Sequence, residues 1–321
     1  MSGMLPPSLW MVSAKHVRKV SDMKSIAIYL ILVVSLVRTL PLHAEPAYMT
    51  SIHPFATILQ QVVGERATVH RLLPPGTSPH TYELRPSDLR FAESSTAVFY
   101  GSPQLDEWVA RFPTVERYEL LEMVPPDALL PLLGDHHHDA PDAHQHAFSD
   151  DIDPHFWTDP LTVKAMLPQL VATLCEIDPP GCGTYTVNAG KFAAELDSLH
   201  HEIARQLAPL KGQTVIMSHP FFHYFLVRYG IKIAGVIETI PGKESTPREI
   251  QRIIKLCAQE HVRAILSQPQ TPDRVAAVVS EATGIPIIEI DPIGGVPGYQ
   301  TYAEIMRTNA QTLLHILQDE Q

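Results

Sequence analysis

Apolar residues in the first part of the chain alternate between strand-like and helix-like patterns. β-Branched and aromatic runs at residues 47–52, 67–73 and 97–101 have the length and composition of short buried strands. Residues 55–64 and 85–94, which lie between them, are predicted to be helices. The first of these helices ends in glycine and the second has proline in its first turn, as helix boundaries often do. This alternation predicts a parallel sheet with crossover helices.

A second block with the same alternation follows in the last third of the chain. Its predicted strands are residues 214–218, 231–237, 264–268 and 286–290. Its predicted helices are residues 221–230, 245–261, 272–284 and a closing stretch from Thr301. The sequence therefore predicts a second parallel sheet.

Two helices are predicted between these blocks, at residues 160–177 and 184–210. The second has an apolar stripe at intervals of three and four, made by Phe192, Leu196, Leu199, Ile203, Leu207 and Leu210. It would be about 40 Å long. We expect an α/β fold of two parallel-sheet lobes joined by one rigid helix, with an N-terminal lobe at residues 45–182, the linking helix at 183–211 and a C-terminal lobe at 212–321. Ligands of such sheets lie beyond the carboxyl ends of their strands.

The N-terminus has the features of a secretory signal peptide. Basic residues precede the apolar run IAIYLILVVSLV, and Leu-His-Ala at residues 42–44 offers a cleavage site. The alternative is a membrane anchor, but the run is shorter than the roughly 20 residues that a spanning helix needs. We therefore expect residues 1–44 to be removed and the mature protein to be periplasmic, with Met1 or Met23 as the translation start.

Composition and charge indicate a soluble globular protein. The chain is 45% hydrophobic and 18% charged, with a formal net charge of −11. Residues 1–44 contribute a net positive charge, so the mature chain is more acidic still. A surface of this sign repels nucleic acid, and no nucleic-acid partner is expected.

The three cysteines suggest one disulfide. Cys175 and Cys182 flank the turn sequence EIDPPG, close enough to be bonded in an oxidising compartment. Cys257 shares its helical spacing with apolar residues, and we expect it to be buried and free. The sequence contains no Cys-x-x-Cys, so neither a thiolate zinc site nor a thioredoxin-type dithiol is indicated.

Four residues could converge on a metal ion once the chain is folded. His219 and Asp291 come directly after predicted strands, His80 closes the loop after the strand at residues 67–73, and His155 lies just before a predicted helix. Three imidazoles and one carboxylate suit Zn²⁺, whereas Mn²⁺ prefers more oxygen. Spacing alone leaves the alternative that these side chains only cap turns.

Four motifs in order strengthen the metal hypothesis. SPHTYELRPSD, DPHFWTDP, SHPFFHYFLVRYG and IDPIGG resemble the motifs of periplasmic solute-binding proteins of zinc and manganese ABC importers. The resemblance covers about residues 47–318 and implies two α/β lobes bridged by a long helix, with the metal between them. It implies His80, His155, His219 and Asp291 as ligands. Manganese-type members look to have glutamate at the third position, so His219 favours zinc.

The resemblance also sets the expected function. It implies high-affinity capture of Zn²⁺ in the periplasm and delivery to an ABC permease in the inner membrane by a monomer, with Zn²⁺ as cargo. Manganese or iron in the same role is the alternative. A secreted zinc hydrolase is the rival from another class, but no HExxH or nucleophile-elbow pattern occurs and Glu83 is the only nearby candidate base. We therefore expect a binding protein and no enzyme.

Other histidines are further candidates for contact with a metal ion. A low-complexity stretch at residues 134–147 resembles the His-rich loop of zinc-type members, and we expect weak metal capture by its histidines, His136, His137, His138, His144 and His146. The alternative is a solvated loop without a role. His223, four residues after His219, is open to three interpretations: a ligand, a group contacting a ligand, or a packing residue. Gln268 stands where relatives often have an acidic residue.

Overall fold

The computed structural model describes residues 45–113, 115–133, 152–238, 245–271 and 274–319, all within the unit that begins at Glu45. The predicted signal peptide and the His-rich stretch lie outside these residues. No helix in the described part of the chain is long and apolar enough to cross a membrane.

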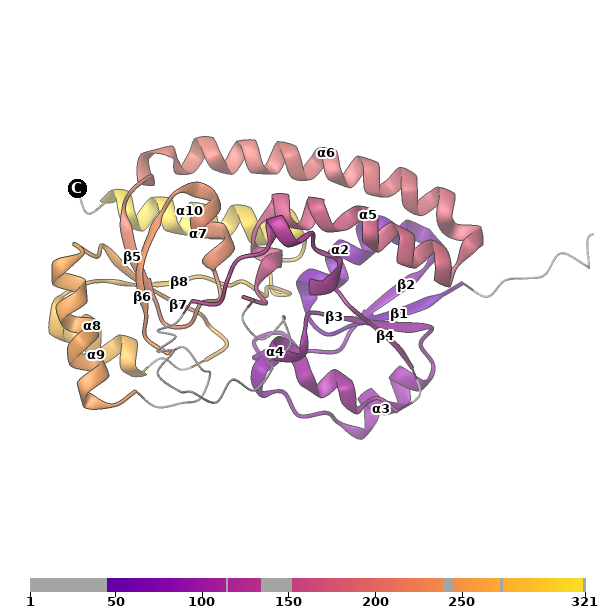
Figure 1. Cartoon of the computed structure of the whole chain (residues 1–321), viewed down its shortest axis with the longest axis horizontal. Coiled ribbons are helices and arrows are strands. Elements are labelled where there is room, and N and C mark those ends of the chain that lie inside the picture. Colours follow the sequence, from indigo (N-terminus) through magenta and orange to yellow (C-terminus); the bar gives the residue numbers. More distant parts are fainter. Residues whose placement is uncertain (1–44, 114, 134–151, 239–244, 272–273, 320–321) are drawn as a thin grey trace, which may run out of the picture. The chain divides into compact units, whose positions relative to one another are not determined.

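The N-terminal sheet has four parallel strands in the order β2-β1-β3-β4. The strands are β1 (Ala47–Thr50), β2 (Thr68–Arg71), β3 (Ala97–Tyr100) and β4 (Glu116–Glu119), and the helices among them are α2 (His53–Val63), α3 (Pro86–Glu93) and α4 (Pro103–Asp106) (Figure 1). The central strand β1 is almost completely buried, which matches its apolar sequence. The edge strand β4 was not predicted, because its sequence ERYE has no apolar run.

The C-terminal sheet repeats this topology with the order β6-β5-β7-β8, again all parallel. Its strands are β5 (Thr214–Met217), β6 (Lys232–Val236), β7 (Ala264–Ser267) and β8 (Ile287–Glu289), and its helices are α7 (His223–Tyr229), α8 (Pro247–Gln259), α9 (Arg274–Thr283) and α10 (Tyr302–Asp319). A capping box between Thr246 and Glu249 starts α8, where the sequence places proline at the first helical position. The predicted two-lobe α/β fold is confirmed.

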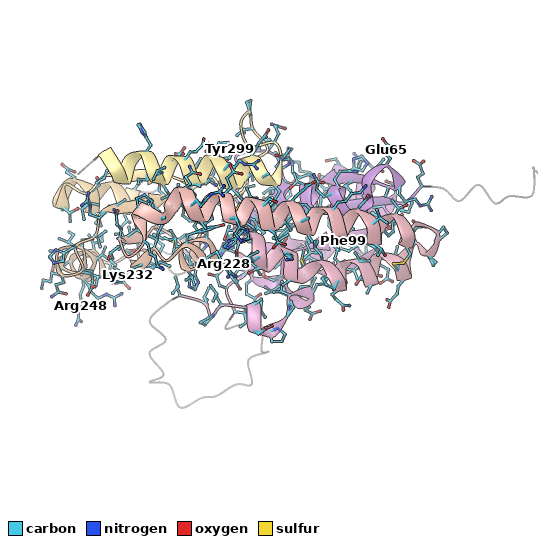
Figure 2. All side chains as sticks on the ribbon, turned by 90° about the horizontal axis from the view of Figure 1, so that it is seen from above. Glu65, Phe99, Arg228, Lys232, Arg248 and Tyr299 are labelled. Carbon is cyan, nitrogen blue, oxygen red and sulfur yellow. A yellow bond between two sulfur atoms is a disulfide. The ribbon has the colours of Figure 1, made fainter. Side chains whose placement is uncertain are left out.

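Two helices connect the sheets, α5 (Pro160–Ile177) and α6 (Cys182–Leu207). Pro168 lies inside α5 without ending it. The 26 residues of α6 give a length of about 39 Å. Its buried face packs on α5 in its N-terminal half and on α10 in its C-terminal half (Figures 1 and 2). The stripe ends in a 3-10 turn, Ala208–Leu210, so the regular helix is three residues shorter at this end than predicted.

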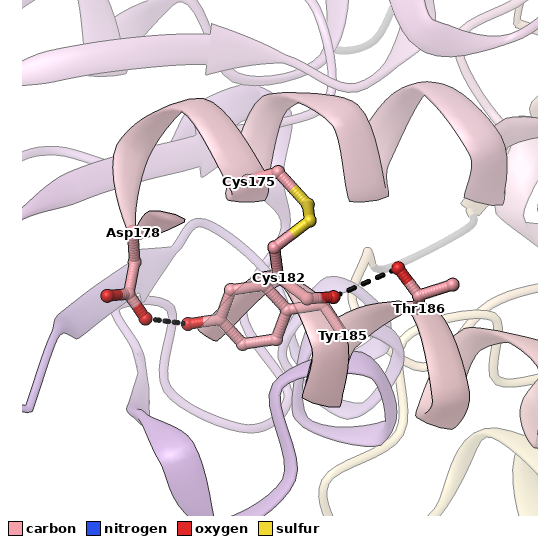
Figure 3. The surroundings of a disulfide bond; sticks show 5 residues. All are labelled: Cys175, Asp178, Cys182, Tyr185 and Thr186. Atoms are coloured by element: carbon pink, nitrogen blue, oxygen red, sulfur yellow. Dashed lines mark hydrogen bonds between the residues drawn. A yellow bond between two sulfur atoms is a disulfide. The ribbon is translucent and has the colours of Figure 1, made fainter. Parts of the chain in front are cut away.

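A disulfide closes the turn between α5 and α6, as the sequence predicts. Cys175 is bonded to Cys182, and Cys257 is free and buried. Within this turn the carboxylate of Asp178 accepts two hydrogen bonds from the Arg66 guanidinium. It also accepts one from the Tyr185 hydroxyl (Figure 3). The turn is therefore fastened to the N-terminal lobe through a buried carboxylate.

Candidate metal centre

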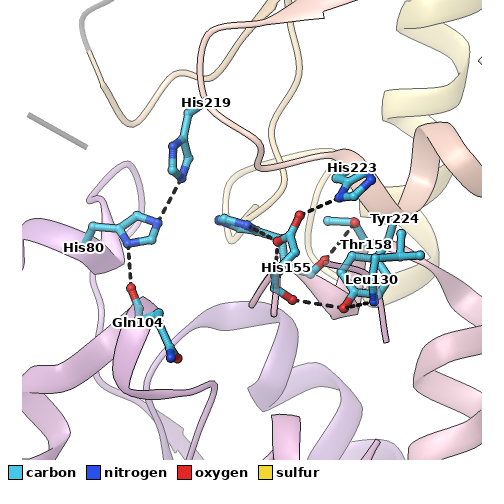
Figure 4. A network of polar contacts seen from close by, with 9 residues as sticks. His80, Gln104, Leu130, His155, Thr158, His219, His223 and Tyr224 are labelled. Carbon is cyan, nitrogen blue, oxygen red and sulfur yellow. Dashed lines mark hydrogen bonds and ion pairs between the residues drawn. The ribbon is translucent and has the colours of Figure 1, made fainter. Parts of the chain in front are cut away.

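Three of the four predicted ligands come together in space. His80 lies in a 3-10 turn after β2, His219 follows β5, and His155 precedes the short 3-10 helix that leads into α5. Each offers one ring nitrogen, and these three atoms lie within 4.8 Å of one another. Figure 4 shows the rings of His80 and His219 reaching toward each other from the two lobes.

The spacing of these nitrogens suits a small tetrahedral cation. Nε2 of His80 and Nε2 of His219 are 3.3 Å apart. Two nitrogens bound at the usual zinc distance of 2.0–2.1 Å in a tetrahedral site would be about 3.3–3.4 Å apart. The His155 ring centroid lies 5.1 Å from that of His219 and 5.6 Å from that of His80. The three rings therefore already surround a volume of the size of one metal ion.

Hydrogen bonds on the far side of two rings fix the nitrogen that faces this volume. Nδ1 of His80 lies 3.2 Å from the backbone carbonyl of Gln104, and Nδ1 of His155 lies 2.8 Å from Oδ1 of Asp153. Because both partners can only accept, each Nδ1 carries the proton and donates it. Nε2 is then the unprotonated nitrogen of both rings, which is the form that binds a metal.

Burial keeps His80 and His219 in the neutral form. It lowers the pKa of His80 to about 3, with a smaller contribution from the neighbouring His155. Burial, followed by the charges that His155 and His80 would carry, holds the pKa of His219 well below its usual range. No proton therefore has to leave these two rings before a cation binds near neutral pH.

Asp153 supplies a buried negative charge beside the three rings. Its side chain is completely buried, and that burial by itself favours the neutral acid. The contacts with His155 and His223 outweigh this effect and lower the pKa of Asp153 to about 2. The sequence interpretation missed this residue, although an acidic side chain two positions before a candidate ligand was a usable signal.

Asp291 lies outside the group of three histidines. Its Oδ1 accepts three hydrogen bonds, from Nε2 of Gln270 at 2.7 Å and from the backbone N–H groups of Ile293 and Gly294. Among the described residues no hydrogen bond reaches its Oδ2. Asp291 is 8% exposed, and Asn309 holds its backbone from α10. One carboxylate oxygen is thus fixed and the other is left open.

The remaining candidates fall into two groups. The five loop histidines, His136, His137, His138, His144 and His146, lie outside the described residues. His223 is buried and its Nδ1 lies 2.9 Å from Oδ2 of Asp153, which in turn contacts the candidate ligand His155. Gln268 donates a hydrogen bond to Thr271 and is not part of the group of three histidines in the described structure.

Residues 49–315 match the family described as zinc-uptake complex component A, periplasmic. The chain belongs to this family. Members of the family are the substrate-binding components of metal transporters and are not enzymes, and they deliver metal to ABC transporter permeases. The hydrolase alternative therefore has no support.

Relatives of this zinc-uptake family differ in the metal that they are named for. The high-affinity zinc uptake system protein ZnuA of Paracoccus denitrificans is 29% identical, over 87% of this chain and 94% of its own length. The manganese-binding lipoprotein MntA of Halalkalibacterium halodurans is 26% identical, over 83% and 86%. A putative metal-binding protein of Thermotoga maritima is 28% identical, over 92% and 100%.

Solved structures share the fold. A crystal structure of ZnuA has a TM-score of 0.70 at 21% identity, covering 85% of this chain and 100% of its own. The periplasmic zinc-binding protein TroA from Treponema pallidum has a TM-score of 0.70 at 18% identity, covering 85% and 99%. At these identities the likeness establishes the two-lobe architecture.

Proposed function

We propose that this chain captures Zn²⁺ with high affinity in the periplasm and delivers it to an ABC permease in the inner membrane. The observation that carries the proposal is the convergence of three imidazole nitrogens within 4.8 Å, two of them 3.3 Å apart. His80, His155 and His219 are proposed as ligands. All three ligands are nitrogen donors, and such a set favours Zn²⁺ over Mn²⁺, which prefers oxygen.

Asp291 is proposed as the fourth ligand. Because Gln270 and two backbone N–H groups occupy its Oδ1, only Oδ2 has lone pairs left for a cation. A modest approach of the C-terminal loop toward the histidines would complete a tetrahedral N3O set. This ligand therefore depends on a movement of the loop after β8, unlike the three histidines that already converge.

Manganese or iron as cargo is the second candidate. One relative of similar identity, MntA from Halalkalibacterium halodurans, is named as a manganese-binding lipoprotein, and this name supports manganese as an alternative cargo. Cellular selection follows metal supply as well as affinity, so the question needs a direct competition of the two ions.

Three features of the precursor complete the proposal. Residues 1–44 act as a cleaved signal peptide, the mature chain is a monomer, and the histidines of residues 134–147 capture Zn²⁺ weakly before it reaches the high-affinity site. The described residues on either side of this stretch are joined by an isolated bridge between Pro131 and Ile152 and by the backbone hydrogen bond from Asp153 to Leu130. A deletion of residues 134–147 leaves these contacts in place.

The test is competition binding of Zn²⁺ and Mn²⁺ to the metal-stripped protein that begins at Glu45. We expect one tight zinc site, displaced poorly by Mn²⁺ and lost in a His80→Ala, His155→Ala, His219→Ala triple variant. His70→Ala is the matched control, because His70 lies on β2, contacts Phe91 and is outside the triad. Tight binding that survives in the triple variant refutes the ligand set, and preferential Mn²⁺ binding supports the second candidate.

The loop is tested in the same assay. Deletion of residues 134–147 should leave the affinity of the tight site unchanged while it removes weaker zinc ions from the total stoichiometry. An unchanged stoichiometry would refute capture by the loop.

A further inference from the structure

Asp153 receives three hydrogen bonds that divide between its two oxygens. Oδ1 accepts from the backbone N–H of His155 at 2.9 Å and from Nδ1 of the same residue at 2.8 Å. Oδ2 accepts from Nδ1 of His223 at 2.9 Å. The carboxylate is therefore a bridge between His155 and His223, as Figure 4 shows for these rings.

His223 is placed to hold this bridge from the C-terminal lobe. It is the first residue of α7, its side chain is buried, and it follows His219 by four positions. The next residue strengthens the connection, because the Tyr224 hydroxyl donates to the backbone carbonyl of Asp153 at 3.0 Å. One short segment thus contributes a candidate ligand and also fixes the segment that carries another.

We propose that His223 is a positioning residue for the bound metal, which acts through Asp153 to hold the ring and the tautomer of His155. The inference rests on the proposed function, since it assigns a role toward the same site. His223 is not among the proposed ligands, because the cluster of potential ligands in the described structure consists of His80, His155 and His219.

The physical reason lies in the needs of a buried carboxylate. Asp153 is completely buried, and His223 is the only hydrogen-bond donor to its Oδ2 among the described residues. Without that donor the carboxylate is free to rotate, which breaks the aligned bond to Nδ1 of His155. His155 then loses the partner that fixes its ring orientation and its tautomer. Loss of such an outer partner typically costs 10–100-fold in metal affinity.

A purely structural role is the competing explanation, and substitution chemistry separates the two. His223→Leu removes the donor and fills its buried position with an apolar side chain. His223→Asn restores it, because the asparagine Nδ2 occupies the same position relative to the backbone as Nδ1 of histidine. Tyr185→Phe is the matched control: Tyr185 also donates to a buried aspartate, Asp178, but on the disulfide-closed turn away from the three histidines.

The experiment measures Zn²⁺ affinity by chelator competition and the visible absorption spectrum of the Co²⁺-loaded protein for the wild type and all three variants. We expect His223→Leu to weaken Zn²⁺ binding about 10–100-fold and to shift the Co²⁺ bands. His223→Asn should recover most of the affinity and the wild-type spectrum. Tyr185→Phe should lower the thermal unfolding temperature without changing either metal readout.

Three results would overturn the inference: wild-type affinity and spectrum in His223→Leu, an asparagine variant as weak as the leucine variant, or an equal loss of affinity in Tyr185→Phe. If His223→Leu does not fold, the Zn²⁺ affinities of His223→Asn and Asp153→Asn are compared instead. The inference then requires that Asp153→Asn alone weakens binding. The His80→Ala, His155→Ala, His219→Ala variant is measured in parallel, because tight binding that survives there refutes the proposed ligands and not only the role of His223.

Discussion

Nε2 of His80 and Nε2 of His219 lie 3.3 Å apart although 139 positions separate the two residues in the sequence. His80 follows a strand of the N-terminal sheet and His219 follows a strand of the C-terminal sheet. A cation bound by both rings, as proposed, would connect the two lobes. Its binding would then stabilise the folded two-lobe arrangement.

Zinc should raise the thermal stability of the protein through this connection. At a free zinc concentration 100 times Kd, the stabilisation is about 2.7 kcal/mol. For a chain of this size that corresponds to an increase in Tm of about 4–5 °C. Calorimetry of the wild type and of His219→Ala, with and without Zn²⁺, checks this. An equal increase in the two proteins would show that zinc binds elsewhere.

Acid should destabilise the metal-free protein through the same histidines. The folded-state pKa of His80 is about 3, below the 6.5 of an unfolded chain, so protons bind preferentially to the unfolded state. The contribution of His80 to the free energy of unfolding is fully present above pH 6.5. It falls as the pH decreases toward 3, by up to about 1.4 kcal/mol per pH unit. His219, whose pKa is also lowered, acts in the same direction.

A matched variant isolates this contribution. Burial raises the pKa of Asp106 to about 6 and that of Glu119 to about 7, and these two groups oppose the histidines over part of the range. We therefore compare urea unfolding of the metal-free wild type and of His80→Gln between pH 7 and pH 4.5. The variant should lose less stability than the wild type on acidification. Parallel pH profiles would contradict the lowered pKa.

The fold was largely predictable because its strands and helices are defined by local apolar patterns. The strand β1 and the stripe on α6 are buried as their spacing indicates. The edge strand β4 escaped prediction, since an edge position needs no apolar sequence and its pairing with β3 is set by tertiary structure.

The convergence of three candidate ligands was predictable, but their supporting contacts were not. His80, His155 and His219 lie near element ends, and the resemblance of four motifs selected them from the other histidines. The contact between His223 and Asp153 joins residues 70 positions apart, and no local pattern encodes such a distance. The lowered pKa values of His80 and His219 likewise follow from burial that only the assembled lobes create.

Reduction of the disulfide should weaken the fold moderately. Cys175 and Cys182 are seven positions apart, and a loop of this size contributes about 2–3 kcal/mol in the chain-entropy account. We expect the Cys175→Ser, Cys182→Ser variant to unfold at lower denaturant concentration by that free energy while its Zn²⁺ affinity stays unchanged. Cys257→Ser is the control for loss of a thiol. A strong loss of zinc affinity in the double variant would show that this turn is coupled to the site.

The ion pair between Arg228 and Asp159 should contribute more to stability than the pair between Lys164 and Asp197. The carboxylate of Asp159 is buried, accepts two hydrogen bonds from Arg228 and also caps the first turn of α5, whereas both partners of the second pair are about 40% exposed. A buried charge that loses its partner keeps its desolvation cost, while an exposed pair is solvated and screened.

Paired substitutions test this difference. Because Arg228 is itself partly exposed, we expect Arg228→Met to cost about 1.5–3 kcal/mol, the range for hydrogen bonds to a charged group. Lys164→Met should cost less than about 1 kcal/mol. Since Arg228 belongs to α7 and Asp159 starts α5, the first substitution also loosens the segment that carries His155, and zinc should dissociate faster from it than from Lys164→Met. Equal free energies of unfolding and equal dissociation rates in the two variants would remove any special role for the buried carboxylate.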